Sequence, residues 1–125
     1  MREILFRGKD NATGEWRYSM TISRHYYDDN EIFSYYIGGG YRTIDGKTLG
    51  QFTGLTDRNG TKIFEGDIVA YRGDEYGVIV YDEESARFCV SFDTWSTDFD
   101  HLYGKELEVI GNKHDNPELI EGVVN

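Results

Sequence analysis

The fold class is set by residues 50–71, GQFTGLTDRNGTKIFEGDIVAY. Asn59 and Gly60 lie between two short apolar stretches, and Asn-Gly is a strong hairpin signal because both residues tolerate positive φ. A second tight turn is expected at residues 65–67, directly before the apolar run at residues 68–71. Strand, turn and strand at this close spacing indicate a small rolled β-barrel.

Residues 15–22 show an unbroken alternation of polar and apolar side chains, which is typical of a strand with one buried face. The pattern predicts that Trp16, Tyr18, Met20 and Ile22 share this face. Residues 94–104 are expected to form a loop or one helical turn. Shorter apolar or alternating runs predict further strands at residues 4–7, 32–37, 68–71, 76–81, 87–92 and 106–111.

The C-terminal region carries the signal of a short helix. Asn116 is a favoured helix cap and Pro117 suits the first helical position, and only a short helix fits before Gly122. The chain shows no internal repeat and no linker. Residues 1–125 are therefore predicted to form one domain.

The composition restricts the class of protein. Its 125 residues include 15 glycines, 10 tyrosines and 7 phenylalanines but one proline, which favours strands joined by tight turns. The net charge of −10 disfavours binding to nucleic acid and to anionic membranes. No apolar run reaches the roughly 18 residues of a membrane span. The lone cysteine, Cys89, allows no internal disulfide, and we expect a cytoplasmic protein.

Three separated sequence blocks occur in one order: residues 1–7, residues 51–60 with 63–69, and residues 108–112 with 116–119. The arrangement resembles the YopX-like family of phage and prophage proteins. The resemblance implies a mainly β domain, an SH3-like rolled barrel with N-terminal strand extensions and a short C-terminal helix, in the cytoplasm of a bacterial host. It carries over no catalytic residue, because the family has no established activity.

The motif positions of the family have architectural explanations. Gly54, Gly60, Gly66 and Gly111 are expected at turns or bulges where a Cβ atom would be unfavourable. Asp67 is expected to accept backbone N–H bonds in its turn.

The segment from Tyr26 to Tyr41 is the candidate binding region, because tyrosine and glycine among polar residues are typical of adaptable recognition surfaces. Two alternatives remain open: the rings close one end of the barrel or pair as strand neighbours, or they stack on single-stranded bases. The second is disfavoured because such platforms need a basic groove. The candidate binding residues are Tyr26, Tyr27, Phe33, Tyr35, Tyr36 and Tyr41.

A catalytic constellation is not evident in the sequence. Asp98, Asp100 and His101 are the best candidates for a metal-dependent site, but they lack a recognised ligand spacing. Cys89 lies in the middle of an apolar strand, where a thiol is usually inert. We therefore expect no cofactor, no metal and no catalytic residue.

The favoured function is a non-enzymatic phage accessory protein that binds another protein or associates with itself through open strand edges. One alternative is a nucleic-acid-binding SH3-like barrel, which fold analogy alone supports. The other alternative is a small metal-dependent hydrolase.

Overall fold

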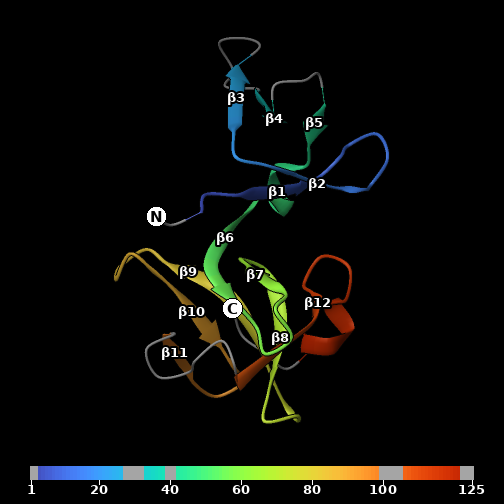
Figure 1. Ribbon diagram of the computed structural model, residues 1–125. Helices are drawn as coiled ribbons and strands as arrows, with labels where there is room; N and C mark the ends of the chain where they lie inside the picture. The colour runs from blue at the N-terminus through green and yellow to red at the C-terminus, as the bar shows by residue number, and fades with distance from the viewer. Residues whose placement is uncertain (1–2, 27–32, 39–41, 99–105, 122–125) are drawn as a thin grey trace. The chain divides into compact units, whose positions relative to one another are not determined.

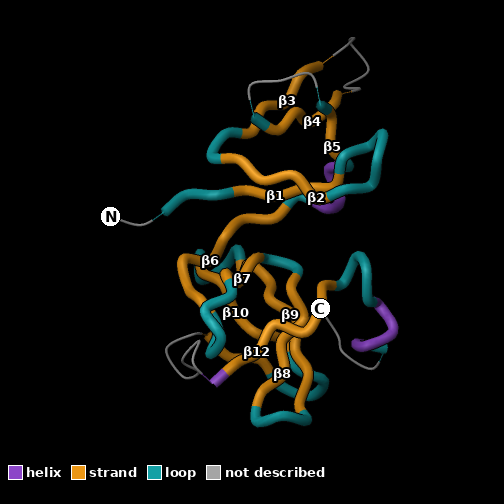
Figure 2. The backbone as a smooth tube through the Cα atoms, turned by 45° about the vertical axis from the view of Figure 1, so that its right-hand side comes forward, coloured by secondary structure: helices purple, strands orange, loops and turns teal. Residues whose placement is uncertain are grey.

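The computed structural model describes residues 3–26, 33–38, 42–98 and 106–121. The chain forms two compact units, Met1–Phe52 and Thr53–Asn125. Antiparallel strands dominate the backbone in both units, with short helical turns between some of them (Figure 2). The predicted mainly β fold is confirmed, and the prediction of a single domain over residues 1–125 stays a prediction.

The first unit contains two small antiparallel sheets. β1 pairs with β2 and with the beginning of β6, and β4 lies between β3 and β5. The elements of this unit, shown in Figure 1, are β1 (Phe6–Lys9), β2 (Trp16–Ser19), β3 (Ile22–Tyr26), β4 (Phe33–Ile37), β5 (Thr43–Ile44), the 3₁₀ turn η1 (Gly46–Thr48) and β6 (Gly50–Thr56), which ends in the second unit.

The predicted continuous strand over residues 15–22 is wrong, because the chain leaves the ladder between β2 and β3. Tyr18 is 54% exposed and Met20 is 69% exposed, so these side chains do not enter a core. Trp16 is half-buried, and its ring centre lies 4.6 Å from the guanidinium carbon of the buried Arg7. The alternating face therefore covers a cation at Trp16, meets solvent at Tyr18 and Met20, and is half-buried at Ile22.

The second unit is built on a five-stranded antiparallel sheet in the order β11-β10-β9-β8-β12. Four strands follow one another as a meander, and β12 returns to pair with β8 (Figure 1). Among the described residues β11 and β12 are edge strands, so these strands close no barrel. The elements are β7 (Lys62–Phe64), β8 (Asp67–Tyr71), β9 (Glu75–Asp82), β10 (Arg87–Ser91), β11 (Ser96–Asp98), β12 (Leu107–Asn112) and the 3₁₀ turn η3 (Pro117–Ile120).

The core of the second unit consists of apolar side chains from β7 to β12. β8 is buried along its whole length, as its apolar run predicts. Each fully buried Val or Ile contributes roughly 1.5–3 kcal/mol relative to an exposed one. β11 is a strand where a loop or helical turn was expected, and residues 99–105 lie outside the described residues. The buried cluster comprises Ile63, Val69, Tyr71, Ile79, Val90, Phe92 and Leu107.

The predicted turn between β6 and β7 is confirmed, but Asn59 does not adopt positive φ as the Asn-Gly pattern suggested. Only Gly60 does, at 83°. The carboxylate of the buried Asp57 accepts the backbone N–H groups of Asn59 and Thr61, at 2.8 and 2.9 Å. A carboxylate that accepts these donors organises the turn, so a second residue with positive φ is unnecessary.

Asn116 precedes η3 as predicted, but its side chain does not cap the helical turn. Its Oδ1 instead accepts the backbone N–H of Asn112 at 3.2 Å. A Cβ atom on Gly111 would lie 2.5 Å from this oxygen, which explains the glycine in β12. The predicted role of Asp67 is confirmed, because its carboxylate accepts the N–H of Phe64 at 2.7 Å. Among the described residues no helix is long and apolar enough to cross a membrane.

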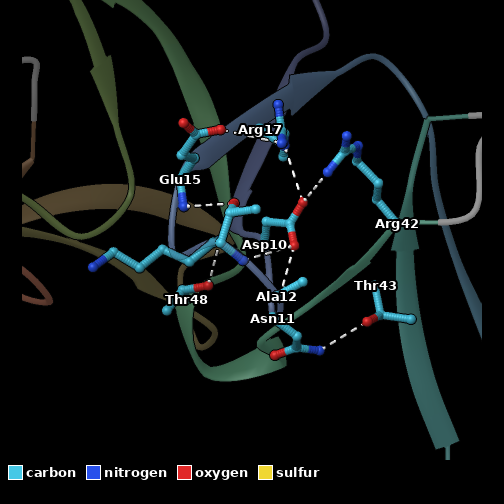
Figure 3. A network of polar contacts seen from close by, with 10 residues as sticks. Asp10, Asn11, Ala12, Glu15, Arg17, Arg42, Thr43 and Thr48 are labelled. Atoms are coloured by element: carbon cyan, nitrogen blue, oxygen red, sulfur yellow. Dashed lines mark hydrogen bonds and ion pairs between the residues drawn. The ribbon is translucent and has the colours of Figure 1, made fainter.

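Asp10 is a buried charge of the first unit, and Figure 3 shows the polar network around it. Its carboxylate accepts hydrogen bonds from the guanidinium groups of Arg42 and Arg17, at 2.8 and 3.2 Å, and from the N–H of Ala12 and Thr13. The network ties the turn after β1 to β2 and to the residue before β5. These bonds, that of Arg42 above all, lower the pKa of Asp10 to about 2.

Replacement of Gly60 by valine is expected to lower the free energy of unfolding by about 1–3 kcal/mol, because a β-branched residue is strained at positive φ. The space around Gly60 is open, so the effect would come from the backbone alone. Gly60→Asn is the matched control, since asparagine tolerates this region better. Urea denaturation of both variants measures the difference. Equal stabilities for the two variants would contradict the assigned conformation.

The Asp10 network is expected to make stability depend on acid pH. The pKa of Asp10 is about 2 in the folded protein against an ordinary 3.8, so its stabilisation is complete above pH 3.8. The contribution disappears as the pH falls from there towards about 2. Asp10→Asn should therefore lower the melting temperature at neutral pH, and the gap to the wild type should narrow in acid. Glu15→Gln, which removes a largely exposed carboxylate beside Arg17, is the control. A gap that is constant with pH would refute this role of the carboxylate.

Candidate binding site

The six predicted binding residues fall in and around the β3–β4–β5 sheet. Tyr26 ends β3 and Phe33 begins β4, where the two residues are paired in the ladder. Tyr27 and Tyr41 lie outside the described residues.

Tyr35 and Tyr36 are neighbours in β4, so their side chains face opposite sides of the sheet. Tyr35 packs on Gly46, where an added Cβ would lie 2.6 Å from ring atoms. Tyr36 meets the ring of His25 edge-on, with centroids 4.9 Å apart. Tyr35 and Tyr36 therefore do not share one aromatic face, and the role of the six residues as a binding surface stays a prediction.

The predicted metal-site residues are only partly described. Asp98 forms an ion pair with Arg87 at 2.7 Å, while Asp100 and His101 lie outside the described residues. No group of three or more His, Cys, Asp or Glu residues that could hold a metal ion occurs in the described part of the chain. Burial, and then the charge of Asp82, raises the pKa of the Cys89 thiol, which disfavours a nucleophilic thiolate.

A pocket in the second unit was not predicted from the sequence. Its volume is about 400 Å³, which lies within the usual range of ligand-binding pockets. It is formed by the β8–β9 turn, the β10–β11 turn and η3. The lining residues are Asp74, Glu75, Tyr76, Phe92, Asp93, Thr94, Trp95, Leu119 and Ile120.

A stacked pair of aromatic rings forms one wall of this pocket. The rings of Phe92 and Trp95 are 4.4 Å apart at 17° to each other, and the Tyr71 ring lies 6.0 Å from that of Phe92. The N–H of Phe92 donates to the carbonyl of Trp95 at 2.7 Å, which closes the turn and holds the rings side by side. Phe92 is only 4% exposed, whereas Trp95 is 42% exposed. The buried ring therefore supports an indole that solvent can reach.

Gly77 in β9 allows this arrangement. A Cβ atom at this buried position would lie 2.7 Å from Cγ1 of Val90 and 3.0 Å from Cδ1 of Phe92. Such distances are too short for an unstrained contact, so the side chains of β10 would have to move. Gly77 thus lets Phe92 pack closely on the sheet.

The rim of the pocket is negatively charged. Asp74 comes from the β8–β9 turn, Glu75 begins β9 and Asp93 comes from the β10–β11 turn, and all three residues are exposed. Among the residues that the structure describes, no lysine or arginine lines the pocket. One weak signal for this site is present in the sequence, because Phe92 and Trp95 place an aromatic residue on each side of a short polar turn.

Gly77→Ala is expected to lower the free energy of unfolding by about 1–3 kcal/mol through overpacking of the sheet. Val90→Ala removes the nearest obstructing atom, so the double variant should lose less stability than the sum of the two single changes. Urea denaturation of the wild type, the two single variants and the double variant gives the coupling free energy between positions 77 and 90. Strict additivity would show that the two positions do not meet.

Comparison with known proteins gives the family. No curated protein sequence matches this chain. Among solved structures, the crystal structure of protein EF1440 from Enterococcus faecalis matches with a TM-score of 0.57 and 24% identity, over 97% of this chain and 100% of that one. At this identity the likeness concerns the fold alone. The family model described as YopX protein matches residues 5–121. The chain therefore belongs to the YopX family.

Proposed function

We propose that this protein is a non-enzymatic binding module, and that the pocket beside Trp95 receives a segment of another protein. The observation that carries the proposal is the exposed indole of Trp95 stacked on the buried Phe92 at the wall of a pocket. Tryptophan is enriched among the residues that contribute most to protein–protein affinity. An aromatic ring that is already held in place loses little conformational entropy on binding.

The strand order supports a finer description of the second unit as an SH3-like barrel that is open between the edge strands β11 and β12. Its meander from β8 to β11, with β12 returning beside β8, is the strand order expected of such a barrel. Loops on a rigid sheet commonly carry binding residues, and the pocket is formed mainly by two such turns. The family supports an accessory role for a phage or prophage product in the host cytoplasm, with a phage or host protein as partner.

The described residues favour binding over the two alternative functions. The raised pKa of Cys89 and the ion pair of Asp98 with Arg87 disfavour nucleophilic and metal-dependent chemistry at these positions. The carboxylates at the rim of the pocket would repel the phosphates of a nucleic acid.

Trp95→Ala is expected to weaken capture of the partner by about 10-fold or more, as for other central aromatic contacts. Its cost in unfolding free energy should stay near 1–2 kcal/mol, because the side chain is partly exposed. Tagged wild type and variant would be used for pull-down from phage-infected host lysate, followed by affinity measurement with the identified partner. Trp16→Phe, which changes the other tryptophan, is the control.

Light scattering of the same proteins distinguishes a foreign partner from a second copy of the chain. Self-association that survives Trp95→Ala but is lost in Tyr36→Ala would place the contact on the predicted tyrosine segment instead. Equal capture by the wild type and Trp95→Ala would refute the pocket as the binding site.

A further inference from the structure

We infer that the pocket beside Trp95 takes a cationic side chain, a lysine or arginine from a basic segment of the partner protein. This inference rests on the proposed function and specifies the chemistry that the pocket selects.

The charge of the pocket favours a cation. Asp74, Glu75 and Asp93 place three carboxylates around the opening, and none of the described residues that line it is basic. The chain as a whole carries a net charge of −10, so the long-range field has the same sign as the pocket. Such a field accelerates the approach of a basic partner and opposes an acidic one.

The aromatic wall favours a cation that is attached to an apolar stem. The indole of tryptophan is the best aromatic partner for an ammonium or guanidinium group. Leu119 and Ile120 of η3, both half-buried, add apolar surface to the same pocket. Lysine and arginine combine a charged head with a methylene stem that packs on apolar groups. An apolar ligand would pack on the apolar surface of Trp95, Leu119 and Ile120, but it would bring no positive charge to the carboxylates at the rim.

The same aromatic cluster already binds a cation within the chain. The guanidinium carbon of Arg72 lies 4.9 Å from the ring centre of Tyr71. Tyr71 in turn contacts Trp95 edge-on, with centroids 6.4 Å apart. Arg72 is not among the residues that line the pocket, so its guanidinium does not form the wall that an incoming side chain would meet.

The test uses Trp16→Phe as the parent protein, so that Trp95 is the only tryptophan and reports on the pocket by its fluorescence. The probes are three synthetic peptides of equal length in which glycines separate lysines, leucines or glutamates. The lysine peptide should bind and shift the Trp95 emission, and this binding should weaken as salt is added. The Trp95→Phe variant should keep part of the affinity for the lysine peptide, because an aromatic face remains. Calorimetry measures this binding.

The role of the rim is tested by two double variants that remove the same charge. Asp74→Asn with Asp93→Asn should weaken binding of the lysine peptide by about 3–10-fold. Glu83→Gln with Glu84→Gln, in the turn between β9 and β10, removes two carboxylates away from the pocket and should change the affinity much less. Thermal unfolding confirms that both variants are folded.

Three results would overturn the inference. Equal weakening by the two double variants would show a general attraction between opposite charges. Tighter binding of the leucine peptide would show an apolar site and would leave the proposed function intact. Failure of every peptide to perturb Trp95 would exclude a cationic occupant, while the Trp95→Ala capture experiment separately decides whether the pocket binds a protein at all.

Discussion

The buried carboxylate of Asp57 is the interaction on which the second unit depends. One of its oxygens accepts the N–H groups of Asn59 and Thr61, and the other accepts the N–H of Val109 at 2.8 Å. Burial acts to raise the pKa of Asp57, but the bonds from Val109, Thr61 and Asn59 outweigh it, so the pKa lies below its ordinary value. An unpaired buried charge would be strongly destabilising, whereas these bonds join the β6–β7 turn to β12.

The pairing of β12 with β8 connects the Asp57 network to the strands that carry the pocket. β12 pairs with β8, and β8 reverses into β9 through Arg72 and Gly73, which both adopt positive φ. This tight reversal presents Asp74 at one side of the pocket. The β9–β10 ladder then brings Phe92 and Trp95 to the same place, although they are some twenty residues away in sequence. The β8–β9 and β10–β11 turns each connect two hydrogen-bonded strands, and loops positioned by such a scaffold commonly carry binding residues.

The buried strand β8 and the family could be predicted from the sequence, whereas the exposed face of residues 15–22 and the pocket could not, for physical reasons. The apolar run of β8 identified a buried strand, because burial leaves a direct mark on residue type. Alternation in residues 15–22 was misleading, because a period of two shows which side chains share a face but not whether another element covers it. Tyr18 and Met20 lie on such an uncovered face. Predicting the pocket would have required the register in which β9 pairs with β10, and no local sequence pattern contains that register. The family resemblance, in contrast, rested on separated motifs and is confirmed.

The acidic residues of this chain therefore differ in what their charge can do. Asp10 and Asp57 are buried, and each has its carboxylate oxygens engaged by donors from the chain itself. Asp74 and Asp93 are exposed at the rim of an aromatic pocket. A hydrated carboxylate gains little from one distant cation, but it gains more when a bound partner excludes water and lowers the local dielectric constant. The net negative charge, which taken alone suggests only solubility, thus includes a small group of carboxylates at the rim of an aromatic pocket, where we propose that a basic segment binds.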